Sequence, residues 1–177
     1  AVVVVVLAIF GYRKFVMEPR EAEAQESLFH AEKLFEKDDY ATALNGDGNF
    51  AGFLDIINDY GNTKAGNLAK YYTGICYLNI GEFDNAVKYL SSYKGKDQLV
   101  KPMAVGAMGD AYMELDNVAE AAKCYEKAAK ESKNSFTSPM YLVRAGFAYE
   151  MVGDYTKALE MYKIIEADYP NSNEGFT

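Results

Sequence analysis

The feature that most constrains this chain is a recurring spacing of small, aromatic and small residues. A glycine is followed three residues later by a tyrosine and nine residues after that by an alanine, at Gly74, Gly109 and Gly146. A weaker fourth copy begins at Ala31, with Leu34 in the aromatic place. The alanines that close the pattern lie 43, 35 and 37 residues apart, at Ala43, Ala86, Ala121 and Ala158. A repeat of this period indicates a solenoid, in which one structural unit is stacked several times.

Each copy has the pattern of two amphipathic helices joined by a short turn. Apolar residues recur three and four positions apart on both sides of turns expected at 38–40, 81–83, 116–118 and 153–155. Small residues at the glycine and alanine places let two antiparallel helices approach closely. Prolines stand where helices are expected to begin or to end: Pro19, Pro102, Pro139 and Pro170.

We therefore predict an all-α, right-handed α-solenoid of about four helix pairs within a domain of residues 18–170. The pairs are expected at 21–60, 64–97, 99–133 and 138–170.

The pattern resembles the tetratricopeptide repeat, a helix-turn-helix unit of 34 residues. The last copy fits best, with Gly146, Tyr149, Ala158, Tyr162 and Pro170 in the expected places. The first copy departs most, because Ser27 and His30 stand where bulky apolar residues are expected. The resemblance implies a protein that binds peptides or proteins in a concave groove lined by the first helix of each pair.

The register of this resemblance places methionine, aromatic and charged side chains in the groove. The expected groove residues are Tyr71, Tyr72, Asn79, Met103, Asp110, Met113, Glu114, Met140, Arg144, Phe147, Glu150 and Met151. Methionine and aromatic rings make an adaptable apolar surface. The alternative is that part of this row is core between helix pairs. The family's carboxylate clamp for acidic tails is not expected, because Arg144 is the only cation in the row.

The beginning of the chain is apolar. Residues 1–10 carry no polar side chain, and valine fills positions 2–6 before Arg13 and Lys14 follow. A membrane-spanning helix needs ~20 apolar residues. We interpret residues 1–17 as the C-terminal part of a truncated membrane-anchor helix, with a short strand or a buried helix as the alternative.

This layout is similar to single-span bacterial tetratricopeptide proteins that associate with the Sec translocon. The similarity implies an inner-membrane protein with its repeats in the periplasm, where it would assist the secretion or folding of exported proteins. A cytoplasmic location is the alternative.

The end of the array lacks an obvious cap. The last helix, about 155–168, carries Leu159, Tyr162, Ile164 and Ile165 on more than one face, and residues 171–177 read as a polar tail without a helical pattern. The end of a solenoid normally has a polar outer face. We therefore expect Ile164 and Ile165 to be covered from outside these residues, by a further helix, a partner, or a second copy in a homodimer.

Composition argues against several other functions. The net charge of −8 makes nucleic acid an unexpected partner, because an acidic domain repels phosphates. The chain has one histidine, His30, and two cysteines, Cys76 and Cys124, which we expect to be packed rather than reactive. No nucleophile–base pair or metal cluster is apparent. We predict no catalytic, cofactor or metal site, and a protein-interaction module rather than an enzyme.

One loop offers a competing interpretation. Residues 45–49 place oxygen-bearing side chains at alternate positions, as a calcium loop does. Phe50 and Ile56, however, occupy the places where such a loop needs glycine and a bidentate acid. We expect instead a glycine-rich break that redirects a helix over 50–60. The alternatives are a cytosolic structural scaffold, or an enzyme or metal-binding protein that uses this loop.

Overall fold

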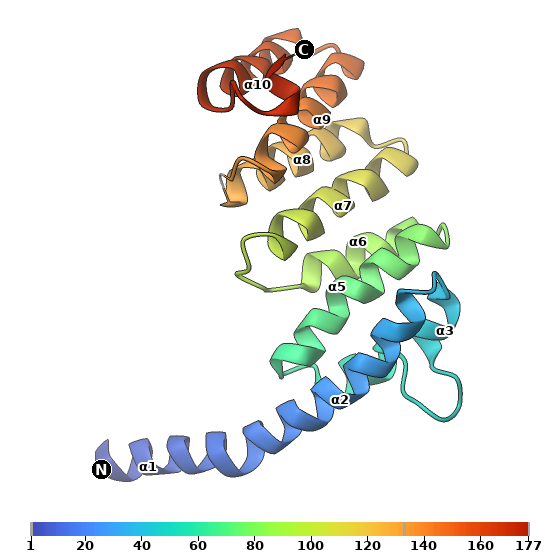
Figure 1. Ribbon diagram of the computed structural model, residues 1–177, viewed down its shortest axis with the longest axis vertical. Helices are drawn as coiled ribbons and strands as arrows, with labels where there is room; N and C mark the ends of the chain where they lie inside the picture. The colour runs from blue at the N-terminus through green and yellow to red at the C-terminus, as the bar shows by residue number, and fades with distance from the viewer. Residues whose placement is uncertain (1, 133, 177) are drawn as a thin grey trace. The chain divides into compact units, whose positions relative to one another are not determined.

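The computed structural model describes residues 2–132 and 134–176 (Figure 1). Within these residues the chain forms ten α-helices, one π-helical turn and one 3-10 turn, and no strand. The fold is therefore all-helical, as the repeat pattern predicts. The chain divides into two compact units, Ala1–Ile80 and Gly81–Thr177.

The N-terminal unit contains five α-helices. They are α1 (Val2–Tyr12), α2 (Glu18–Phe35), α3 (Tyr40–Asn45), α4 (Phe53–Tyr60) and α5 (Lys64–Asn79), with the π-helical turn η1 (Arg13–Met17) between the first two. Helix α2 packs against α3, α4 and α5. The core between them is made of Leu28, Leu44, Phe53, Ile56 and Cys76, each at most 6% exposed.

The start of α5 is held by side-chain caps. The Thr63 hydroxyl accepts a hydrogen bond from the Gly66 N–H at 2.9 Å. The Glu21 carboxylate of α2 accepts from the N–H groups of Lys64 at 2.6 Å and Ala65 at 3.1 Å. These acceptors satisfy donors that have no partner inside the helix, and they tie α2 to α5.

The glycine-rich break predicted in the first repeat lies between α3 and α4. Gly46 and Gly48 have φ of +79° and +87°, a region that favours glycine. A Cβ at Gly52 would lie 2.3 Å from the Leu44 carbonyl oxygen, so the loop closes on its own backbone. The Asp47 carboxylate accepts from the N–H groups of Asn49 and Phe50, both at 2.9 Å. These bonds hold the loop together, and α4 begins at Phe53 rather than at residue 50.

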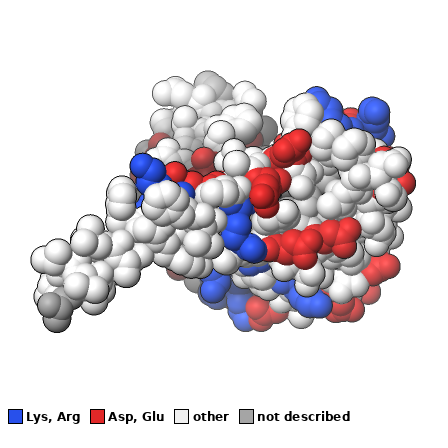
Figure 2. Space-filling model, turned by 90° about the horizontal axis from the view of Figure 1, so that it is seen from below, with Lys and Arg blue, Asp and Glu red and all other residues white. Residues whose placement is uncertain are grey.

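No helix end separates the predicted anchor segment, residues 1–17, from the next helix, since α1, η1 and α2 follow one another without a break. The wide turn is closed by the Glu18 N–H bonded to the Arg13 carbonyl, immediately before Pro19, which has no N–H to donate. Every residue from Val2 to Phe10 is exposed. Figure 2 shows this segment as a protruding arm that is free of charged side chains along most of its length. Among the described residues, no helix combines the length and apolarity needed to cross a membrane.

The C-terminal unit is a stack of antiparallel helices. It contains α6 (Phe83–Ser92), α7 (Val100–Glu114), α8 (Val118–Ser132), α9 (Thr137–Met151), α10 (Tyr155–Asp168) and the 3-10 turn η2 (Asn173–Phe176). Each α-helix packs against the next. Pro102 and Pro139 lie in the first turns of α7 and α9, as predicted, and Pro170 follows the end of α10.

At two of the repeated glycines, Gly109 and Gly146, an aromatic ring lies against the helix backbone. A Cβ at Gly109 would lie 2.6 Å from the Tyr125 ring on α8, and one at Gly146 would lie 2.4 Å from the Tyr162 ring on α10. Both distances are shorter than any ordinary contact between carbon atoms. The first small residue of the pattern is therefore required in these two pairs by a tyrosine ring of the second helix, sixteen residues further along the chain.

The end of the chain differs from the prediction. Residues 173–176 form η2 instead of an unstructured tail, and this turn packs against α9 and α10. Ser172 organises it, because its hydroxyl donates to the Tyr169 carbonyl at 2.9 Å and accepts from the Gly175 N–H at 3.1 Å. Ile165 is 4% exposed. Ile164 is half-buried and packs against the same core. The prediction that Ile165 needs cover from outside the chain is therefore wrong, and the packing of Ile164 and Ile165 gives no support to a homodimer through α10.

Candidate functional site

A pocket between α7 and α9 brings together several of the predicted groove residues. Its volume is about 340 Å³, and it is lined by Asp110, Met113, Tyr125, Arg144, Phe147, Ala148 and Met151. Five of these were predicted from the repeat register; Tyr125 and Ala148 were not. Because α7 and α9 are the first helices of successive pairs, the pocket lies where the resemblance places a ligand. We call it the groove pocket.

The polar part of the groove pocket is a compact three-residue cluster. The Asp110 carboxylate accepts hydrogen bonds from Arg144 Nη1 and from the Tyr125 hydroxyl, both at 2.8 Å. The Arg144 guanidinium lies over the Tyr125 and Tyr141 rings, at 5.9 and 5.8 Å from their centroids. Burial, followed by the hydrogen bond to Asp110, raises the pKa of Tyr125. The two opposite charges therefore compensate each other and are fixed in position.

The apolar part of the groove pocket is unusually open to solvent. The Phe147 ring is 57% exposed and Met151 is 64% exposed, while Met113 is half-buried. Large exposed apolar side chains grouped around a pocket are typical of a surface that binds a partner, and are uncommon on a surface that faces only solvent. Glu114 and Glu150 are exposed on the same two helices. Neither takes part in an ion pair among the described residues.

The other predicted groove residues lie elsewhere. Met103 is 41% exposed but does not line the groove pocket, and Met140 packs against the core. In the N-terminal unit, the Tyr72 ring stacks on Phe53 with centroids 5.2 Å apart, so it belongs to the core side. Tyr71 contacts Tyr72, with ring centroids 5.5 Å apart, and the Asn79 side chain donates to the carbonyl of Ile75 in its own helix at 2.8 Å.

Sequence reasoning missed Tyr125 because this residue lies on the second helix of its pair. The available signal was its position sixteen residues after Gly109, the same interval that separates Gly146 from Tyr162. Tyr125 does pack against its own pair's glycine, but its hydroxyl also reaches Asp110 in the groove pocket.

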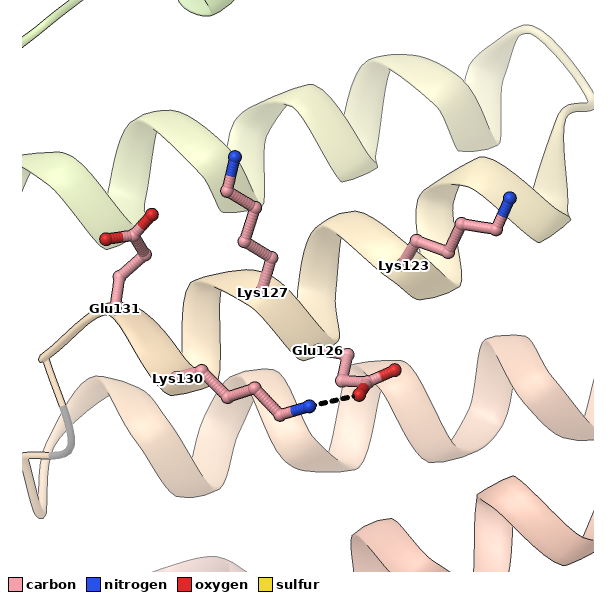
Figure 3. A pocket seen from close by; sticks show the side chains of 5 residues that line it. All are labelled: Lys123, Glu126, Lys127, Lys130 and Glu131. Carbon is pink, nitrogen blue, oxygen red and sulfur yellow. Dashed lines mark hydrogen bonds and ion pairs between the residues drawn. The ribbon is translucent and has the colours of Figure 1, made fainter.

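A second hollow, on the outer face of α8, is lined only by charged side chains (Figure 3). Its volume is about 330 Å³, and its lining residues are Lys123, Glu126, Lys127, Lys130 and Glu131. Lys130 pairs with Glu126, which also accepts from the Tyr149 hydroxyl, and Glu131 pairs with Lys101. The lysines of both pairs are open to solvent, and ion pairs with a solvent-exposed partner contribute little binding energy. This face offers no apolar anchor, so the groove pocket is the better candidate site.

The cysteine and histidine side chains considered for catalysis or metal binding in the N-terminal unit pack against other side chains and do not line the groove pocket. Cys76 is fully buried, and burial raises the pKa of its thiol to about 12. The His30 ring stacks on Phe50 with centroids 3.9 Å apart. Within residues 2–132 and 134–176, no group of three or more His, Cys, Asp or Glu side chains is placed to hold a metal ion. The groove pocket itself offers an arrangement suited to binding.

Comparison with known protein families finds the tetratricopeptide repeat at residues 68–97, 103–135 and 141–172. These segments cover 95 of the 177 residues and overlap the second, third and fourth predicted repeats. Comparison with curated proteins gives no match.

Proposed function

We propose, from the premise that this chain belongs to the tetratricopeptide repeat family, that it binds an extended segment of a partner protein in the groove pocket. Tetratricopeptide repeats indicate protein partners, and the groove pocket supplies what such a partner needs. Phe147, Met113 and Met151 offer an apolar surface. The Asp110–Arg144 pair offers polar groups whose positions are fixed by Tyr125.

The observation that carries this proposal is the exposure of Phe147. An aromatic ring that is 57% exposed beside a pocket gains most from being covered, because burying apolar area is favourable by about 25 cal/mol per Å². Aromatic side chains are also enriched among the residues that dominate binding energy at interfaces.

The test is selection of binding peptides from a random library, followed by affinity measurement with purified variants. Phe147→Ala should weaken the selected peptides by about 2 kcal/mol, the loss typical of a central aromatic contact. Leu159→Ala is the matched control, because Leu159 is 52% exposed on α10 and does not line the groove pocket. Equal affinity of wild type and Phe147→Ala would contradict the proposal.

We further propose that residues 1–17 hold the chain at a membrane. The support is the apolar segment Val2–Phe10, which is exposed throughout, followed by the basic residues Arg13 and Lys14. Leu7→Glu should abolish co-flotation of the protein with lipid vesicles, because a carboxylate is costly in the hydrocarbon layer. Ala22→Glu, at an exposed position of α2, should leave flotation unchanged. Equal flotation of both variants would overturn the tether.

For the location in the cell, we propose a bacterial inner membrane with the repeats in the periplasm. There the protein would assist the secretion or folding of exported proteins. Fusions of compartment-sensitive reporters to the end of the chain test it. Reporter activity in the periplasm supports this location, and activity in the cytoplasm overturns it.

A further inference from the structure

Phe147 separates the groove pocket from a second, larger pocket, which we call the end pocket. The end pocket has a volume of about 520 Å³ and lies among α9, α10 and η2. Its lining residues are Val143, Phe147, Tyr162, Ile165, Glu166, Glu174 and Gly175. Phe147 lines both pockets. A peptide segment bound in the groove pocket therefore reaches the end pocket when it continues past the Phe147 ring.

The floor of the end pocket is apolar and fixed in shape. Ile165 is 4% exposed at its base. The Tyr162 ring packs edge-on against Phe147, with centroids 6.3 Å apart, and lies directly against the backbone of Gly146. A pocket with these walls accepts an apolar side chain without rearrangement of its own.

The charge on the wall of the end pocket is acidic. Glu166 is exposed, lines the pocket and takes part in no ion pair among the described residues, and Glu174 lines it as well. Arg144 is the one cation among the described residues that line either pocket, and it is paired with Asp110. Glu114 and Glu150 are exposed and are chain neighbours of Met113 and Met151, which line the groove pocket. Because these carboxylates add negative charge, the groove favours a ligand of positive charge.

We propose that the two pockets form one groove for a basic, apolar peptide segment. The segment places one apolar side chain on each side of Phe147, and a lysine or arginine next to the second apolar side chain faces Glu166. This inference rests on the proposed function of the groove pocket and adds the chemistry of its ligand.

The test compares three peptides built on one library-selected sequence, with lysine, glutamine or glutamate beside the second apolar side chain. Fluorescence anisotropy at low and high salt gives their affinities. The lysine peptide should bind wild type about three- to fivefold more tightly than the glutamine peptide, as one exposed ion pair allows, and high salt should remove this difference. Glu166→Lys should reverse the order, so that the glutamate peptide binds best.

The control is Glu160→Lys, which makes the same change of charge on α10 at an exposed residue outside both pockets. It should leave the order of the three peptides unchanged. Equal affinities of the three peptides, or the same order in Glu166→Lys as in wild type, overturn the inference. If Phe147→Ala still weakens peptide binding in that case, the proposed function stands. If no library peptide depends on Phe147, the proposed function fails and this inference fails with it.

Discussion

At the scale of single residues, Gly146 lies so close to the Tyr162 ring that a methyl group has no room there. A Cβ would be 2.4 Å from Tyr162 Cε1. We therefore expect Gly146→Ala to lower the free energy of unfolding by about 1–3 kcal/mol, the usual effect of overpacking. Urea denaturation followed by circular dichroism measures it. Gly11→Ala is the control, because a Cβ at Gly11 meets no atom within 4 Å, and an unchanged midpoint in both variants would contradict the prediction.

A second residue-scale prediction concerns Cys76, which is fully buried. Because burial raises the pKa of its thiol to about 12, almost no thiolate is present near pH 8 in the folded protein. In the Cys124→Ser variant, which leaves Cys76 as the only cysteine, a thiol reagent should react at least about 100-fold more slowly than after denaturation. Reaction at the denatured rate in the absence of denaturant would show that this helix opens freely.

At the scale of elements, the loop between α3 and α4 contains two kinds of glycine. Gly48 has a positive φ but open space around it, whereas Gly52 has an extended backbone and lies against the Leu44 carbonyl. Gly52→Ala should therefore lower the free energy of unfolding by about 1–3 kcal/mol, through overlap. Gly48→Ala should cost about 1 kcal/mol, through backbone strain alone.

Thermal unfolding of the two loop variants separates these causes. A larger loss in Gly48→Ala than in Gly52→Ala would show that backbone conformation, and not close approach, governs this loop.

Much of the element structure was predictable from sequence because it depends on local patterns. The helix starts near Pro102 and Pro139 follow from the geometry of proline, and the helix pairs follow from the small-aromatic-small spacing. The turn η2 was not predictable, because a side-chain hydrogen bond of Ser172 holds it and no periodic pattern marks it. The groove was predicted only in part. The repeat register places both Tyr72 and Phe147 in the expected groove, but the Tyr72 ring stacks on Phe53 in the core whereas Phe147 is exposed.

At the scale of the whole molecule, several tyrosines bear on alkaline stability. Burial, with a nearby carboxylate as a further cause, raises the pKa of Tyr72, Tyr125 and Tyr149 above the usual value of 10.0. The folded state therefore keeps these protons at pH values where the unfolded state loses them. Their contribution to stability is complete below pH 10 and is lost as the pH rises further.

We expect the free energy of unfolding, measured with urea at a series of pH values, to fall steadily above about pH 10. Tyr149→Phe should make this fall less steep, because it removes one of the groups that titrate differently in the two states. A constant free energy of unfolding across this range, or an unchanged slope in Tyr149→Phe, would contradict the prediction.

Phe147 lies between the Asp110–Arg144 ion pair and the acidic wall of the end pocket, and this position has a consequence for the rates of binding and release. The Glu166 carboxylate, which takes part in no ion pair among the described residues, attracts a basic segment from a distance, so it governs how fast that segment arrives. The ring makes only short-range contacts, and it governs how long the segment stays. Salt should therefore slow association while leaving the lifetime of the complex almost unchanged, and truncating the ring at Phe147 should shorten that lifetime without slowing arrival.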